Sequence, residues 1–296
     1  MKRFNVHLGI FLAVCIASAS VFAQQQPVEP APVPKAVAIP RPTAEEVQLA
    51  ERSLAKFLET ADPAVKEINQ KYPGLISVRV PPANSAVVPN LAPFFQKKHE
   101  TNLEVAKQGD IDVLFMGDSI TDFWRNPEGN YAGKPVLDKY FGTLKVANFG
   151  IAGDTTQGVL FRLQHGEGQG FSPKAIMLMI GTNNTAQNTA AEIAEGIGAI
   201  TLEMQKDFPK AKILLLAIFP RSTPSDPVRA KIAEINGMIA KLNDGDRVQY
   251  LDIGPKFLDD GGNISKDIMS DALHPTTKGY EIWAEAVKEP LANLMK

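Results

Sequence analysis

The stretch IDVLFMGDSI, residues 111–120, decides the fold of this chain because an apolar run leads directly into a polar turn. The run itself, residues 111–116, is typical of a buried strand. Gly117, Asp118 and Ser119 then place a serine hydroxyl where a helix begins, and backbone N–H groups at a helix start face a bound ligand. Such a serine suits acyl-transfer chemistry, although the same turn taken alone is also typical of a helix cap.

The chain from residue 94 onward alternates apolar runs with helical patterns. The apolar runs cover residues 111–116, 144–149, 175–180, 213–219 and 248–253. Patterns typical of helices cover residues 155–164, 190–207, 227–242 and 276–288. This alternation predicts one α/β domain over residues 94–296, in which helices cover both faces of a parallel sheet. Sheets of this kind bind ligands at the carboxyl ends of their strands.

The N-terminus has the pattern of a signal peptide over residues 1–23. Two basic residues precede an apolar run over residues 8–16, and small residues lead to a predicted cut after Ala23. The run is too short to span a bilayer, so no membrane span is predicted. We expect export to the periplasm or the medium, with a lipoprotein anchored at Cys15 as the alternative.

Two further segments precede the predicted domain. Residues 24–42 are rich in Pro and Gln and predict an extended, poorly ordered linker. Thr43 and Glu46 match a capping box ahead of a helical pattern, so residues 43–93 predict a helical and irregular extension. We expect this extension to pack against the main domain, with a separate binding role as the alternative.

Composition narrows the classes of function. Cys15 is the only cysteine and belongs to the leader, so the mature chain has neither a disulfide nor a thiolate site. The formal net charge of −2 becomes −4 when Lys2 and Arg3 leave with the leader. Without a basic excess, neither nucleic acid nor an anionic membrane surface is an expected partner.

Polar and glycine-rich clusters follow the other predicted strands. Residues 148–156 follow the second strand, residues 181–184 follow the third, and residues 271–275 come after the fifth strand and a connector. Each cluster alone fits an ordinary cap, turn, polar loop or surface pair. Because the carboxyl ends of parallel strands share one edge of a sheet, the clusters together predict a catalytic site around Ser119.

An ester hydrolase needs a nucleophile, a base, a group that orients the base, and donors for the oxyanion. Ser119 is the candidate nucleophile, His274 the base and Asp271 the group that orients it. The candidate oxyanion donors are the N–H groups of Ser119 and Gly153 and the side-chain amide of Asn183. This chemistry needs no metal and no organic cofactor.

These clusters resemble the four sequence blocks of the SGNH hydrolase superfamily, the GDSL-type esterases. Ser119, Gly153, Asn183 and His274 match its four lettered residues, and Asp271 matches the acidic member of its triad. The resemblance covers most of the predicted domain and implies a flavodoxin-like, three-layer α/β/α fold with five parallel strands. Within the superfamily, the chain is most similar to the catalytic subunits of platelet-activating-factor acetylhydrolase.

Several neighbouring side chains have roles that the sequence predicts less directly. Ile120 stands where the family name has leucine, a change that leaves the nucleophile untouched. Asp118 is expected to organise the turn, and Asp154 to cap the helix that follows it. Trp124 is predicted to bind substrate as a platform for a sugar ring, with a core aromatic as the alternative. Arg221, after the fourth strand, is a candidate neighbour of the cleft.

The predicted activity is that of an exported serine esterase acting on short acyl groups, preferably O-acetyl groups on carbohydrate or on a small molecule. A lysophospholipase or lipid acetylhydrolase with the same triad is the first alternative. A metal-dependent phosphoesterase is remote, because His99, His165 and His274 are the only histidines of the mature chain and lie in different contexts. A non-catalytic binding protein is the other remote alternative, and the oligomeric state is left open.

Overall fold

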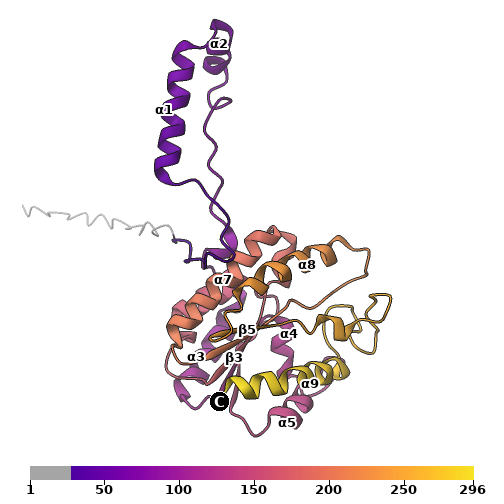
Figure 1. The fold of residues 1–296 in the computed structure, drawn as a ribbon. Coiled ribbons are helices and arrows are strands. Elements are labelled where there is room, and N and C mark those ends of the chain that lie inside the picture. Colours follow the sequence, from indigo (N-terminus) through magenta and orange to yellow (C-terminus); the bar gives the residue numbers. More distant parts are fainter. Residues whose placement is uncertain (1–27) are drawn as a thin grey trace, which may run out of the picture.

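The computed structural model describes residues 28–296 (Figure 1). The predicted signal peptide with Cys15 and the first residues of the predicted linker lie outside the described residues. Among residues 28–296, no helix combines the length and the apolar character needed to cross a membrane.

A five-stranded parallel sheet forms the centre of the molecule, with the strand order β2-β1-β3-β4-β5. The strands are β1 Val113–Gly117, β2 Val146–Asn148, β3 Ala175–Met179, β4 Lys212–Leu216 and β5 Val248–Leu251. Every strand overlaps the apolar run that predicted it. The expectation of an α/β fold with a five-stranded parallel sheet is confirmed.

Helices cover both faces of the sheet, which gives the predicted three layers (Figure 1). One face is covered by α3 Gln96–Gln108, α6 Thr156–Arg162, α7 Ala190–Asp207 and α8 Pro227–Ile239, and the other by α4 Ser119–Asp122, α5 Lys134–Phe141 and α9 Thr277–Leu294. Alternate strand residues enter the two cores, so that Leu114 and Met116 join one core and Phe115 joins the other.

Helix α5 was not predicted from the sequence and α9 is longer than predicted, whereas α7 has the predicted bounds. Helix α5 has only eight residues, and its buried residues are Val136 and Phe141, so its pattern is too short to stand out. Helix α9 was expected to end near residue 288 but continues through Pro290. The helix continues because Leu291 and Leu294 extend its buried face over the core that contains Phe115 and the buried residues of α5.

Residues 28–42 are not the poorly ordered linker that their composition predicts. Ala31 and Val37 are buried in the larger of the two cores, the one beneath α3, α6, α7 and α8. The N–H of Ala31 donates to the carbonyl of Val87 over 2.7 Å. Gly198 of α7 leaves room for this segment, because a Cβ at that position would lie 2.6 Å from Val37. The prediction was wrong because isolated apolar residues among prolines have no regular period even where they are buried.

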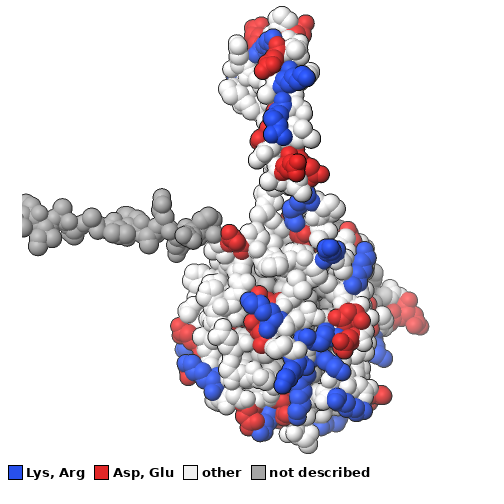
Figure 2. Space-filling model, turned by 60° about the vertical axis from the view of Figure 1, so that its left-hand side comes forward, with Lys and Arg blue, Asp and Glu red and all other residues white. Residues whose placement is uncertain are grey.

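Helices α1 Ala44–Thr60 and α2 Pro63–Lys71 form an arm, residues 43–83, that projects from the domain (Figures 1 and 2). The predicted capping box of Thr43 and Glu46 is present at the start of α1. Neither helix contains a buried residue. The expectation that this part of the extension packs against the domain is therefore wrong.

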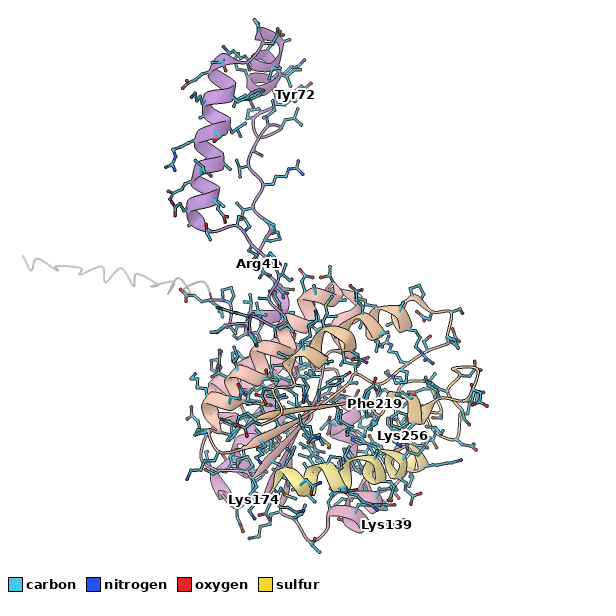
Figure 3. All side chains as sticks on the ribbon, viewed as in Figure 1. Arg41, Tyr72, Lys139, Lys174, Phe219 and Lys256 are labelled. Atoms are coloured by element: carbon cyan, nitrogen blue, oxygen red, sulfur yellow. The ribbon has the colours of Figure 1, made fainter. Side chains whose placement is uncertain are left out.

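Both ends of the arm are fixed at its base by one buried carboxylate of α7. Glu195 accepts hydrogen bonds from the guanidinium of Arg41, at 2.8 and 2.6 Å, and from the side-chain amide of Asn84, at 2.9 Å. Figure 3 shows Arg41 at the base of the arm and Tyr72 near its far end. The base is thus part of the packed domain, while the helices beyond it are surrounded by solvent.

Candidate active site

Ser119 is the first residue of α4, directly after the carboxyl end of β1. The sharp turn into α4 requires glycine at position 117, because a Cβ there would lie 2.2 Å from Thr121 Oγ1 and 2.3 Å from the carbonyl oxygen of Met179. Asp118, which was expected to organise the turn, does so as a helix cap that accepts from the N–H of Ile120 over 3.0 Å. As the first residue of a helix, Ser119 has an N–H group without an intrahelical partner.

The structure brings Ser119, His274 and Asp271 into direct contact although 155 positions separate the serine from the histidine. Ser119 Oγ lies 2.9 Å from His274 Nε2, and His274 Nδ1 lies 2.7 Å from Asp271 Oδ2. The other carboxylate oxygen of Asp271 accepts from the N–H groups of Leu273, at 3.0 Å, and His274, at 2.8 Å. The three side chains form the arrangement in which a carboxylate orients an imidazole toward a hydroxyl.

The surroundings of Asp271 keep its carboxyl group ionised. Burial acts to raise the pKa of Asp271, but hydrogen bonds from the ring and backbone of His274 outweigh it and hold the pKa below its ordinary value. An ionised Asp271 accepts a hydrogen bond from the Nδ1–H of His274, which leaves Nε2 free to accept from Ser119. The geometry therefore suits removal of a proton from the serine hydroxyl.

Two aromatic rings beside His274 were not among the predicted site residues. The ring centroids of Phe123 and Tyr131 lie 5.0 and 5.4 Å from that of His274, and the two rings stack on each other at 5.8 Å. Both side chains are half-buried. The sequence offered one signal, because Phe123 follows closely after Ser119, whereas no motif marks Tyr131.

Trp124 does not line the site, so its prediction as a sugar platform is wrong. Its side chain is 0% exposed and lies among Phe115, Tyr280 and Trp283 in the core beneath α9. The short turn after α4 directs this ring inward, and Phe123 is the aromatic that faces the histidine. The core alternative for Trp124 is the one observed.

Two of the three predicted oxyanion donors, Gly153 and Asn183, come from loops that follow β2 and β3. Gly153 is exposed in the loop after β2 and has a φ of 87°, a conformation that favours glycine. Asn183 follows β3, and its side-chain amide donates to the carbonyl of Asp154 over 2.8 Å. This bond links the loop that carries Gly153 to Asn183. The second hydrogen of the amide is left for another acceptor.

Arg221 lies near the site as expected, whereas Asp154 has a partner that the sequence did not indicate. The guanidinium of Arg221 contacts Thr182 Oγ1 at 3.3 Å, next to Asn183, so it reaches the edge that carries the other clusters. Asp154 accepts from the N–H of Thr155 over 2.8 Å, but its carboxylate also pairs with the buried Arg162. The expectation that Asp154 is simply a helix cap is therefore wrong, since Thr155 occupies the cap position of α6.

Within residues 28–296, no three His, Cys, Asp or Glu side chains gather in a way that could hold a metal ion.

A parallel sheet with a serine, a histidine and an aspartate in contact at its carboxyl edge defines a class of hydrolytic enzymes. Residues 115–282 match the family described as GDSL-like Lipase/Acylhydrolase. The platelet-activating factor acetylhydrolase IB subunit alpha2 of Homo sapiens is 35% identical over 221 residues, which cover 72% of this chain and 93% of the relative. The chain belongs to the GDSL-like lipase/acylhydrolase family, and it is an ester-hydrolysing enzyme.

A second relative agrees with this assignment, and a solved structure has the same fold. The alpha1 subunit of the same acetylhydrolase from Rattus norvegicus is 33% identical over 198 residues, which cover 67% of this chain and 82% of the relative. A GDSL-like lipase from Bacteroides thetaiotaomicron has a similar fold, with a TM-score of 0.54 and 20% identity over 67% of this chain and 97% of that one.

Proposed function

We propose that this protein is an exported serine esterase that hydrolyses esters of short acids, with Ser119 as its nucleophile. The observation that carries the proposal is the continuous contact from Ser119 Oγ through His274 to Asp271, with distances of 2.9 and 2.7 Å. Ser119 attacks the ester carbonyl while His274 Nε2 takes its proton, and Asp271 stabilises the imidazolium. His274 then donates that proton to the departing alcohol, and a water activated by His274 releases the acid from the acyl-enzyme.

The negative charge that develops on the carbonyl oxygen is stabilised by donors in fixed positions. In our proposal these are the N–H groups of Ser119 and Gly153 and the amide of Asn183. The positive φ of Gly153 and the bond from Asn183 to Asp154 support this role, because both hold the donors in a defined geometry before substrate arrives.

For the substrate, we propose an acetyl ester on a carbohydrate. The curated relatives are named as acetylhydrolases, which supports a small acyl group. The half-buried rings of Phe123 and Tyr131, which replace Trp124 as the candidate aromatic surface, support a sugar on the alcohol side. Export is proposed from the leader pattern in residues 1–23.

A lipid acetyl ester is the second candidate, and the named substrate of the curated relatives favours it. The two candidates share the acyl group and differ in the alcohol, so the alcohol must be varied to separate them. We would compare acetate release from an acetylated xylan with release from an acetylated choline phospholipid. Faster release from the glycan supports the carbohydrate proposal, and faster release from the phospholipid contradicts it.

The first experiment is a rate series on aryl esters with acyl chains of two to twelve carbons, with the mature wild type beside Ser119→Ala. We expect a steep preference for acetyl that the variant abolishes. A preference for long chains would contradict the short-acyl proposal while leaving the serine mechanism intact. A variant as active as the wild type at every chain length would show that Ser119 is not the nucleophile.

A further inference from the structure

The loop between β2 and α6, residues 149–155, carries Gly153 and is held from two sides. On its outer side, Asp122 Oδ2 accepts from the N–H of Ala152 over 3.0 Å. The guanidinium of Arg125 donates to the carbonyls of Asn148 and Gly150, both over 2.7 Å. This side of the loop is fixed by the same turn that carries Ser119.

The inner side of the loop is fixed through Asp154, the residue after Gly153. All polar groups of Asp154 have partners. The backbone N–H donates to the carbonyl of Ile151, and the backbone carbonyl accepts from the side-chain amide of Asn183 over 2.8 Å. One carboxylate oxygen accepts from the N–H of Thr155, and the other from Arg162 Nε and Nη2 at 3.0 and 2.8 Å. The side chain is 0% exposed. Asp154 thus connects three parts of the site: the loop of residues 149–155 that carries Gly153, the Asn183 amide and the buried Arg162.

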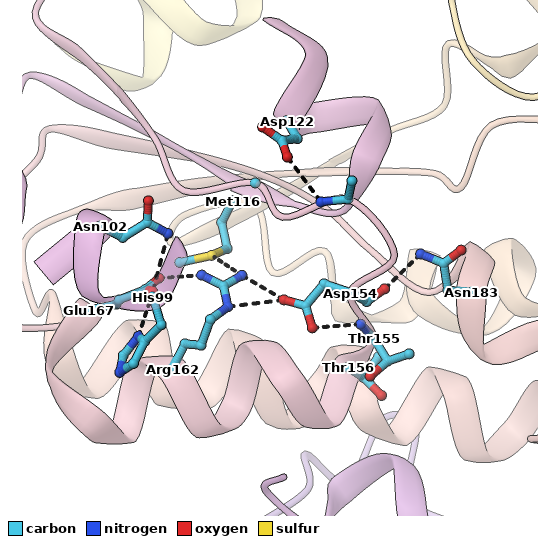
Figure 4. Close-up of polar contacts among 12 residues, drawn as sticks. His99, Asn102, Met116, Asp122, Asp154, Thr155, Thr156, Arg162, Glu167 and Asn183 are labelled. Atoms are coloured by element: carbon cyan, nitrogen blue, oxygen red, sulfur yellow. Dashed lines mark hydrogen bonds and ion pairs between the residues drawn. The ribbon is translucent and has the colours of Figure 1, made fainter. Parts of the chain in front are cut away.

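The buried arginine lies between two carboxylates (Figure 4). Arg162 is fully buried and pairs with Asp154 on one side and with Glu167 on the other. Glu167 in turn contacts His99 Nδ1 at 2.8 Å and the amide of Asn102 at 3.2 Å. Burial opposes the charge of Arg162, but the two carboxylates outweigh burial and raise the pKa of its guanidinium.

A purely structural role does not account for the position of this cluster. Burying two charges costs free energy that their attraction only partly repays, so a buried ion pair is weak evidence for a stabilising role. Here the charged side chain belongs to the residue that also bonds Asn183 through its carbonyl. A rigid charge pair at this point would fix donors whose misplacement by about 1 Å can cost about 10²-fold in rate.

We propose that Asp154, held by Arg162, is a positioning residue that fixes the Gly153 peptide and the Asn183 amide for oxyanion binding. The inference rests on the proposed serine esterase function. It assigns to Asp154 an effect on the transition state exerted through the Gly153 N–H and the Asn183 amide, without contact with the substrate.

The test is Asp154→Asn, which keeps the shape of the side chain and removes its charge. We expect kcat on an acetyl aryl ester to fall about 10- to 100-fold with KM within about twofold, the signature of an interaction made only in the transition state. In an Asn183→Ala background, the same change should cost several-fold less, because one of the two donors through which Asp154 acts is gone. A general loss of stability would not produce this dependence.

A buried carboxylate outside the cluster provides the matched control. Glu195→Gln removes a buried carboxylate at the base of the arm. This change is expected to lower the Tm, as the loss of one partner of a buried pair does. It should leave kcat within about twofold of the wild type, since Glu195 contacts neither Arg162 nor residues 149–155.

Gly158→Ala tests the same inference without altering charge, in case Asp154→Asn does not fold. A Cβ at position 158 would lie 1.9 Å from Asp154 Oδ1, so alanine displaces the carboxylate. Alanine is also favourable within α6. We expect kcat to fall in this variant as well.

The inference is overturned if Asp154→Asn, or Gly158→Ala where the former does not fold, keeps kcat within about threefold of the wild type. It is also overturned if the kcat of the double variant falls by the full product of the fold losses measured for Asp154→Asn and Asn183→Ala alone. An active Ser119→Ala variant would instead overturn the proposed function. The two failures are therefore distinguishable.

Discussion

Asp118 precedes Ser119 and has a carboxyl group that lies almost entirely in the protein interior. One of its oxygens caps α4, and the other is buried without a hydrogen-bond partner among the described residues. Burial is the main cause that raises the pKa of Asp118 to about 7, and the nearby charge of Asp154 acts in the same direction. The folded protein therefore holds this proton in a pH range where the unfolded chain has lost it.

This linkage gives a pH-dependent prediction for Asp118→Asn. Because the unfolded carboxyl ionises near its ordinary value, Asp118 lowers the stability of the wild type increasingly as pH rises from about 4 to about 7, and this contribution is constant above that range. Asparagine cannot ionise and keeps the cap. We expect the variant to match the wild type near pH 4 and to be more stable by about 2–4 kcal/mol near pH 8. Urea unfolding at both pH values checks this, and a constant difference would contradict it.

Asn183→Ala tests the proposed oxyanion donor directly. Loss of one such donor is expected to lower kcat by about 10²–10³ and to leave KM nearly unchanged. Asn184→Ala is a neighbouring control, because the side-chain NH₂ of Asn184 donates to Thr156, Gln157 and Asn188 and to none of the proposed catalytic residues. Steady-state kinetics on an acetyl aryl ester measures both variants. A nearly fully active Asn183→Ala enzyme would exclude this role.

At the scale of single residues, the sequence predicted the site residues that follow strands and missed the charged residues that are buried in the interior. Ser119, Asn183 and His274 follow strands or their connectors, so the rule for parallel sheets places them at one edge. Arg162 and Glu167 occupy a helix and its end, where charged residues ordinarily face solvent. Their burial against Asp154 depends on tertiary contacts that no local pattern expresses.

At the scale of elements, apolar runs located all five strands, most clearly where a strand is buried on both faces and is therefore continuously apolar. The first strand, third strand and α7 are the clearest cases. Helix α9 shows the limit of local rules, since Pro290 predicts an earlier end. Burial of Leu291 and Leu294 in the core outweighs that preference.

The contact between α9 and α4 gives a prediction at this scale. The hydroxyl of Tyr280, buried in α9, donates to the carbonyl of Ile120 over 2.7 Å. Tyr280→Phe leaves that buried carbonyl without its donor and is expected to cost about 1–3 kcal/mol of unfolding free energy. Tyr72→Phe on the exposed arm is the matched control and should have no measurable effect. Equal stability of the two variants in thermal unfolding would contradict the prediction.

At the scale of the whole molecule, the arm is the part that the sequence placed wrongly. Its helices have amphipathic patterns, which ordinarily indicate packing against a domain. In the structure, many of the large exposed apolar side chains belong to this arm: Leu49, Phe57, Ile68, Tyr72, Leu75 and Val80. A periodic pattern shows that a helix has an apolar face, and it does not show where that face lies.

Because neither arm helix contains a buried residue, the domain should fold and act without them. We predict that replacing residues 44–80 with a short Gly-Ser linker changes the Tm by less than about 3 °C and kcat/KM on an acetyl aryl ester by less than about twofold. A short linker suffices, since Arg41 and Asn84 bind the same carboxylate of Glu195. Differential scanning calorimetry and steady-state kinetics measure the two quantities.

A longer deletion supplies the control for this prediction. Removing residues 28–83 also takes away Ala31 and Val37, which are buried in the larger core, and leaves Glu195 without Arg41. This deletion is expected to lower the Tm clearly, because it exposes apolar surface on α7 and leaves a buried carboxylate without its cation. If the short deletion destabilised the protein as much as the long one, the arm helices themselves would contribute to the stability of the domain. If only the long deletion does so, that contribution comes from the base of the arm, and the exposed helices are free to serve a role other than folding.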